Sequence, residues 1–310
     1  MYGADFTNKR TAFNSPRLFA KGYSLGYGYG SKDPYTTILE AAQKLGMKVY
    51  LGSIFTYGSY DAILEAGGLD HIKDVVDDGL DLIRDMYENY SHYDSFAGYY
   101  IADETCDAWL NRSGGVNLYR SLYLPQSNLI HELDPERKIM ISPAIWRSGT
   151  YAKGEENLYQ LIKPEEEGGR PVVDIVAAQD CLGREDSLAV SDSAYRSYEN
   201  YAQAWAKGVR RAGAQFWQDA EVFEITYQSK RYADDVDSME MQSKYTNGII
   251  VFDIPHYLSE VSQGAINSWK RFDISSILAN YSKRYYTQYK ELDRVGRDCK
   301  PVKPYKMKNK

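Results

Sequence analysis

Short apolar segments alternate with longer segments of helical periodicity along most of this chain, and this alternation constrains the fold more than any other feature. The apolar segments span residues 47–55, 96–104, 138–146, 172–180, 215–221 and 248–253, and the helical segments span 34–45, 72–87, 117–132, 156–162, 193–211, 234–245 and 274–292. Near-continuous apolar strands separated by helices are typical of a parallel sheet that is covered on both faces. The sequence therefore predicts an α/β protein.

Two α/β architectures have this order of elements, the doubly wound sheet and the (β/α)8 TIM barrel. Polar or acidic residues end most of the predicted strands, and they come from several different strands, as in the active sites of barrels. We therefore predict a TIM barrel of which about six strand–helix units are visible. Because unpaired edge strands are prone to association, the two missing units either precede this sequence or are replaced by cover from residues 1–33.

The barrel is predicted to span residues 34–295, between an irregular segment at 1–33 and a basic tail at 296–310. Its first helix has clear end signals. Asp33 is suited to the N-cap, Pro34 to the first helical position, and Gly46 to the position just after the helix. These signals place the start of the regular region at residue 34.

The charge and the cysteine content exclude several classes of function. The chain has 37 basic and 43 acidic side chains and a net charge of -6, which disfavours a nucleic-acid partner. Cys106, Cys181 and Cys299 form no disulfide framework, and no CxxC or HExxH spacing is present. No segment reaches the roughly 18 apolar residues of a membrane span. We therefore expect no metal, no cofactor and no membrane span.

The first 20 residues contain no apolar run of signal-peptide length. The sequence as written therefore predicts a cytoplasmic protein, whereas a signal upstream of it would predict an extracellular or periplasmic one. The oligomeric state is left open, although an exposed barrel edge would favour association.

Two of the predicted strands end on a glutamate, Glu104 and Glu221. The carboxyl ends of parallel strands open on one face of a barrel, so both side chains are expected at the same rim. Because side chains alternate along a strand, Asp103 lies on the other face from Glu104 and is predicted to be structural. Glycoside hydrolysis needs such a pair, since one carboxyl protonates the leaving oxygen and the other, ionised, attacks the anomeric carbon.

Other polar and aromatic residues at strand ends are suited to binding a sugar. The predicted substrate-binding residues are Tyr100, Trp146, Gln179, Asp180, Trp217, Asp219, His256 and Tyr257. Amide and carboxylate groups hydrogen-bond sugar hydroxyls, and aromatic rings stack on the apolar face of a sugar. Capping, core packing and ordinary polar contacts are the alternative roles for these residues.

Alternative chemistries remain open. Asp219 or Glu224 would replace Glu221 if Glu221 faces away from the pocket. Cys106 and Cys181 follow strand-end carboxylates, so a thiol nucleophile is an alternative, as is a metal held by the same acids. A catalytically silent barrel that binds carbohydrate or acts as a scaffold is the main alternative to an enzyme.

Four blocks of sequence, in order, carry a family resemblance. They are residues 98–104 (GYYIADE), 175–183 (IVAAQDCLG), 216–224 (FWQDAEVFE) and 252–259 (FDIPHYLS). Over about residues 33–259 the chain resembles the bacterial domain-of-unknown-function family 4434, which is grouped with the TIM-barrel glycosidases. The resemblance implies a (β/α)8 barrel in which this chain begins near the third strand.

The resemblance also implies roles for the two glutamates. In the large retaining glycosidase clan with this fold, the acid/base ends strand four and the nucleophile ends strand seven, and Glu104 and Glu221 fall on these positions. The implied function is therefore a retaining glycoside hydrolase with a carbohydrate substrate. The sequence departs from the clan at Asp103, where an asparagine is usual.

Overall fold

A computed structural model describes residues 2–26, 33–56, 58–183, 192–224, 228–229 and 232–252. The predicted helix at 274–292 and the basic tail at 296–310 lie outside these residues. The chain divides into two compact units. The first consists of Met1–Ala178 and Tyr201–Trp217, and the second consists of Gln179–Asn200 and Gln218–Lys310.

The main sheet has six strands, and each lies within one of the predicted apolar segments. They are β4 (Val49–Gly52), β6 (Phe96–Tyr100), β7 (Lys138–Ile141), β8 (Ile175–Gln179), β9 (Gln215–Glu221) and β12 (Gly248–Phe252). Their order is β12-β9-β8-β7-β6-β4, so strands that follow one another along the chain are neighbours. Strand β4 pairs in parallel with β6, β6 with β7, and β7 with β8. The predicted α/β class, with six strand–helix units of a barrel, is confirmed.

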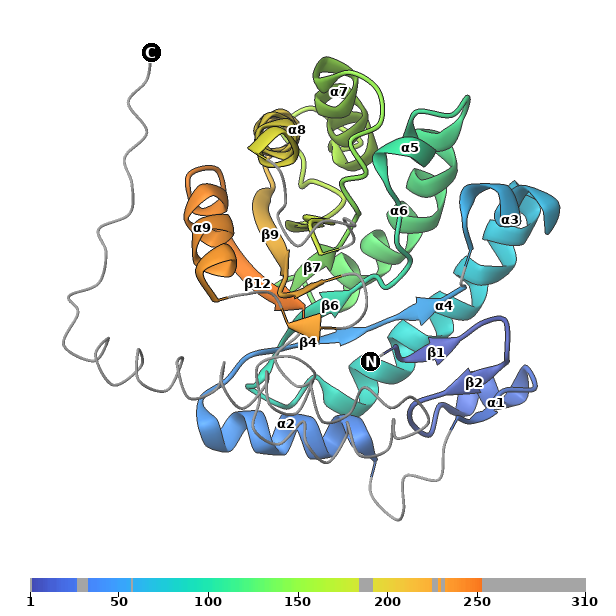
Figure 1. Cartoon of the computed structure of the whole chain (residues 1–310). Helices are drawn as coiled ribbons and strands as arrows, with labels where there is room; N and C mark the ends of the chain where they lie inside the picture. The colour runs from blue at the N-terminus through green and yellow to red at the C-terminus, as the bar shows by residue number, and fades with distance from the viewer. Residues whose placement is uncertain are drawn as a thin grey trace. The chain divides into compact units, whose positions relative to one another are not determined.

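Helices connect these strands. The long ones are α2 (Pro34–Leu45), α4 (Leu69–Tyr90), α6 (Gly115–Leu133), α7 (Tyr151–Ile162), α8 (Asp192–Arg211) and α9 (Tyr232–Ser243), and the short ones are α3 (Tyr60–Glu65) and α5 (Asp107–Leu110). Within the first unit α4 packs against α6, and α6 against α7, as a layer alongside β4, β6 and β7 (Figure 1). Within the described residues, no helix combines the length and the apolar character needed to cross a membrane.

The end signals of the first long helix are confirmed. The Asp33 carboxylate accepts hydrogen bonds from the backbone N–H groups of Tyr35, at 3.0 Å, and Thr36, at 3.4 Å. Gly46 follows α2 with a φ of 67°, in the left-handed region that a residue with a side chain rarely adopts. Both ends of α2 are therefore fixed by local sequence.

The N-terminal segment differs from its prediction as irregular. It contains β1 (Ala4–Asp5), β2 (Arg10–Thr11), α1 (Pro16–Ala20) and β3 (Ser24–Leu25). Strand β1 pairs in parallel with β5 (Ile54–Phe55), which comes just after β4. The small sheet β3-β2-β1-β5 therefore adjoins β4, the edge strand of the main sheet (Figure 1).

Ion pairs hold this segment on α4. The guanidinium of Arg17 pairs with Asp85, and the ammonium of Lys9 lies 2.9 Å from the Asp78 carboxylate. Sequence periodicity did not detect these elements because each strand has only two residues.

Candidate active site

Strand β6 has one face toward the helices and one face away from them. The hydroxyl of Tyr99 lies 3.3 Å from the Asp134 carboxylate, which directly follows α6, so Tyr99 faces the helices. Gly98 faces the other way, since a Cβ added to it would lie 2.7 Å from the ring of Tyr50 on β4. By alternation, Tyr100 shares the face of Gly98 and is half-buried.

Glu104 lies beyond the end of β6, at the carboxyl side of the sheet. The regular strand ends at Tyr100, earlier than predicted, and the chain continues alongside the segment after β7. There the N–H of Ala144 donates to the carbonyl of Thr105 at 2.8 Å. Glu104 is exposed between the buried residues Asp103 and Thr105, so its side chain is accessible to solvent.

Asp103 is buried, with 4% of its surface exposed. Its Oδ1 accepts from the backbone N–H of Thr56 at 2.9 Å and from the Thr56 hydroxyl at 2.8 Å. Its Oδ2 has no partner among the described residues. Burial and, to a smaller extent, the charge of Glu104 raise the pKa of Asp103 to about 6, although the hydrogen bonds from Thr56 lower it. The position agrees with the structural role predicted for Asp103.

We expect this raised pKa to be visible in stability. Because the folded state favours the protonated form, Asp103 contributes most below its unfolded pKa of 3.8, and the contribution is lost as the pH rises through about 6. The shift corresponds to about 3 kcal/mol. Asp103→Asn keeps the acceptor for Thr56 and removes the charge. We therefore expect the variant to gain stability relative to wild type between pH 4 and pH 7.5, measured by urea unfolding. An unchanged difference between the two proteins across this range would contradict the shift.

Trp146 lies five residues beyond the end of β7 and is 43% exposed. Its ring packs against the ring of Trp109 in a T-shaped arrangement, with 5.3 Å between the centroids. The acid that fixes its backbone is Asp107, which the sequence analysis did not single out. The one signal for Asp107 was its place directly after a strand-end segment, at the start of a short helix.

Trp217 is the third residue of β9, and the strand continues for four residues beyond it. The indole N–H of Trp217 donates to the side-chain carbonyl of Gln215 at 3.0 Å. The structure therefore places this predicted binding residue at the amino end of its strand, unlike Trp146.

In the second unit, Asp180 links several elements. Its buried Oδ1 accepts from the backbone N–H groups of Leu182, at 3.0 Å, and Glu221, at 3.3 Å. Its Oδ2 accepts from the side-chain amide of Gln242 on α9 at 2.6 Å. Gln179, the preceding residue, is half-buried at the last position of β8. Asp180 thus connects the ends of β8 and β9 with α9.

Glu221 is buried at the last position of β9. Its Oε2 accepts from the backbone N–H of Gly183 at 2.8 Å. A Cβ on Gly183 would lie 2.4 Å from the carbonyl oxygen of Phe223 and 2.8 Å from Oε2 of Glu221. The absence of a side chain at Gly183 therefore allows this contact with the Glu221 carboxylate.

The structure places the remaining predicted residues only in part. Asp219 is buried on β9, and its carbonyl accepts from the N–H of Asp180 at 3.0 Å. Glu224 belongs to β10 (Phe223–Glu224), which pairs with β11 (Gln228–Ser229). The side chain of Glu224 lies outside the described part of the structure. His256 and Tyr257 lie outside the described residues.

The thiol of Cys106 does not fit a nucleophile. Cys106 is fully buried, and burial raises its pKa to about 12, so the thiol stays protonated at neutral pH. Cys181 is also buried. Across the part of the chain that is described, no group of three or more His, Cys, Asp and Glu side chains is arranged to hold a metal ion.

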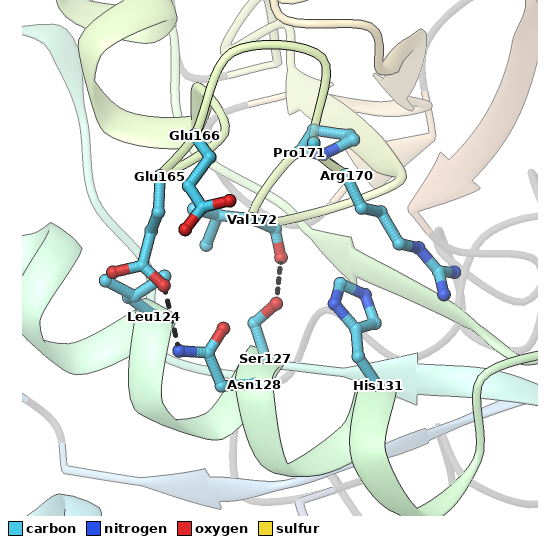
Figure 2. A pocket seen from close by; sticks show the side chains of 10 residues that line it. Leu124, Ser127, Asn128, His131, Glu165, Glu166, Arg170, Pro171 and Val172 are labelled. Atoms are coloured by element: carbon cyan, nitrogen blue, oxygen red, sulfur yellow. Dashed lines mark hydrogen bonds between the residues drawn. The ribbon is translucent and has the colours of Figure 1, made fainter.

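A cavity of about 230 Å³ lies in the first unit, beside segments that lead into the amino ends of β7 and β8. It lies between the C-terminal half of α6 and the segment that leads from α7 to β8 (Figure 2). Its polar lining includes His131, Glu166 and Arg170, together with Glu165, whose carboxylate accepts from the amide of Asn128 at 3.1 Å (Figure 2). None of the predicted site residues lines it.

The alternation of strands and helices, with six strands of one sheet in the order of the sequence, defines the class of α/β proteins with a barrel-like sheet. The chain belongs to the family described as "Domain of unknown function (DUF4434)", whose model matches residues 8–263. No curated protein matches the chain.

Two solved structures that the chain matches are described as glycosidases. One is described as the crystal structure of a putative alpha-L-fucosidase from Bacteroides thetaiotaomicron VPI-5482, with a TM-score of 0.65 at 19% identity over 94% of this chain and 84% of that chain. The other is a GH2 beta-galacturonidase from Eisenbergiella tayi bound to galacturonate, with a TM-score of 0.35 at 16% identity over 70% and 40% of the two chains. The first similarity establishes a shared fold, and the second overlap is too small to do so.

Proposed function

We propose that the protein is a retaining glycoside hydrolase, in which Glu104 is the acid/base and Glu221 is the nucleophile. The fold is glycosidase-like. Glu104 follows β6 and Glu221 ends β9, and β7 and β8 lie between these two strands in the strand order of the sheet. Trp146, exposed beyond β7, is proposed to stack on the sugar.

The observation that carries the proposal is the contrast between the two glutamates. Glu221 is buried at the last position of β9, and the backbone N–H of Gly183 donates a hydrogen bond to its Oε2, which orients the carboxylate. Glu104 is exposed beyond the end of β6, where its carboxyl group is accessible to the leaving oxygen of a bound glycoside. Two carboxyl groups in different environments are the pattern of acid/base and nucleophile pairs.

Hydrolysis of a panel of aryl glycosides tests this proposal. The panel includes an α-L-fucoside, because a protein described as a putative alpha-L-fucosidase shares the fold. Proton NMR of the first product formed distinguishes retention, which we expect, from inversion. A crystal structure adds an independent measure, since carboxyl groups about 5–5.5 Å apart support retention and about 6.5–9.5 Å support inversion. Absence of hydrolysis across the panel and across natural oligosaccharides would count against an enzyme.

Carbohydrate binding without cleavage is the second candidate, and the exposure of Trp146 favours it as well. Aspartate at position 103, in place of the clan's usual asparagine, agrees with a barrel that has lost activity. Saturation-transfer NMR against the same sugars separates the candidates. Binding without release of product would support the silent barrel.

A further inference from the structure

The segment after β7 is held by a buried carboxylate. Asp107, the first residue of α5, is 1% exposed. Its Oδ1 accepts from the N–H of Trp146 at 3.0 Å, and its Oδ2 accepts from the N–H of Ser148 at 2.6 Å. Arg147, between them, has a φ of 59°, a conformation that costs free energy for a residue with a side chain. Both oxygens of Asp107 therefore hold a strained segment in one conformation.

The carbonyl groups of the same segment are held as well. The side-chain amide of Asn111, which follows α5, donates to the carbonyl of Ser148 at 2.8 Å. The hydroxyl of Tyr201 on α8 donates to the carbonyl of Gly149. The backbone from Trp146 to Gly149 is thus hydrogen-bonded by side chains of both α5 and α8.

The ring of Trp146 is held through a second aromatic contact. Trp109, which it packs against, is stacked on Tyr119, with 6.2 Å between the centroids and 9° between the planes. Tyr119 is fully buried, so the ring series begins in the core and ends at the exposed Trp146. A large ring that is both exposed and fixed offers stacking area without the entropic cost of ordering it on binding.

The need for Asp107 is not explained by packing alone. Removing a carboxylate from water is unfavourable unless hydrogen bonds replace the lost hydration. Burial raises the pKa of Asp107, and the backbone N–H groups of Trp146, Ser148 and Ala108 act against that rise. The buried acid, Asp107, and the strained backbone of Arg147 both fix the conformation of the segment after β7, in which Trp146 is the exposed large hydrophobic residue.

We propose that Asp107 is a positioning residue, which fixes Trp146 as a preformed platform for stacking on the apolar face of a pyranose ring of the substrate. The inference that the ligand is a sugar rests on the proposed function, whether the protein hydrolyses carbohydrate or only binds it. The positioning role concerns the free protein and does not depend on it. Asp107 contacts no sugar in this arrangement and acts through Trp146.

Two variants test the positioning role. Asp107→Asn keeps an acceptor at Oδ1 for Trp146 and places a donor opposite the N–H of Ser148, whereas Asp107→Ala removes both acceptors. The matched control is Asp61→Asn, an exposed acid in the same unit whose partner is Arg112. Indole ¹H–¹⁵N spectra of the free protein report the order of Trp146. We expect its signal to shift and its heteronuclear NOE to fall in Asp107→Asn, and further in Asp107→Ala, with no change in the control.

The affinity of the variants for sugars tests whether Trp146 is a platform for carbohydrate. We expect Asp107→Ala and Trp146→Ala to weaken sugar binding by about three- to tenfold, the scale of one aromatic contact, with Asp107→Asn between them and wild type. Any hydrolysis should show a raised KM with kcat little changed. An unchanged Trp146 signal in a folded Asp107→Asn or Asp107→Ala protein overturns the positioning role, and unchanged affinity in Trp146→Ala overturns the platform. Absence of sugar binding by wild type instead overturns the proposed function.

Discussion

Glu221→Gln is expected to lower turnover of any glycoside that the protein hydrolyses by on the order of 10⁴-fold or more, the scale of losing a covalent nucleophile. The amide oxygen of Gln can still accept from the N–H of Gly183, which lies 2.8 Å from the present carboxylate. The fold should therefore survive, and the loss should appear in kcat. The measurement is the rate of aryl glycoside hydrolysis, with urea unfolding as the check on stability.

Glu104→Gln should have a different signature. Loss of a general acid lowers the rate by about 10²- to 10⁴-fold. The loss should be large for alkyl leaving groups, which need protonation, and small for dinitrophenyl leaving groups, which do not. The alkaline limb of the pH profile, which reports loss of the proton from the acid/base, should also disappear. This dependence on the leaving group separates an acid/base from a residue that only supports the structure.

Glu132→Gln is the matched control, because Glu132 is an exposed glutamate on α6. It should leave all rates unchanged. Undiminished activity in Glu104→Gln or Glu221→Gln would remove that residue from the mechanism. In the case of Glu221, Asp219 would then be the next acid to replace, since it lies on the same strand.

Sequence alone predicted the repeating units of the fold because their signals are local. The strand at Gln215–Glu221 begins and ends where the apolar segment does, and α8 differs from its predicted range by one residue. The cap at Asp33 was visible because the donors that it accepts from are two and three residues away. The apolar run predicted the end of one strand wrongly, because β6 ends at Tyr100 although the apolar sequence continues to Ala102.

The rest of the candidate site depends on contacts between distant residues. Asp107 accepts from residues 39 and 41 positions later in the chain, and Glu221 accepts from a residue 38 positions earlier. No periodicity or motif reports such contacts in a single sequence. Asp180, predicted to bind sugar, could not be recognised as the residue that joins β8, β9 and α9 for the same reason.

Gly98→Ala is expected to have the largest effect on stability. A Cβ at this position would lie 2.1 Å from the carbonyl oxygen of Lys138, its register partner on β7, and 2.7 Å from the ring of Tyr50. The ring can turn aside, but the carbonyl cannot move without shifting β7. We therefore expect a loss of about 3 kcal/mol or more, the upper range for overpacking. Urea unfolding measures it.

The double variant Tyr50→Ala/Gly98→Ala identifies which contact is responsible. If the ring is the obstacle, the double variant recovers most of the cost of Gly98→Ala, and if the Lys138 carbonyl is the obstacle, the two costs add. We expect additivity, because the backbone contact is the closer one. A Gly98→Ala protein as stable as wild type would mean that β6 and β7 do not pair in this register. The placement of Glu104 beyond the end of β6 relies on that register, so the same experiment also tests the premise on which the acid/base assignment stands.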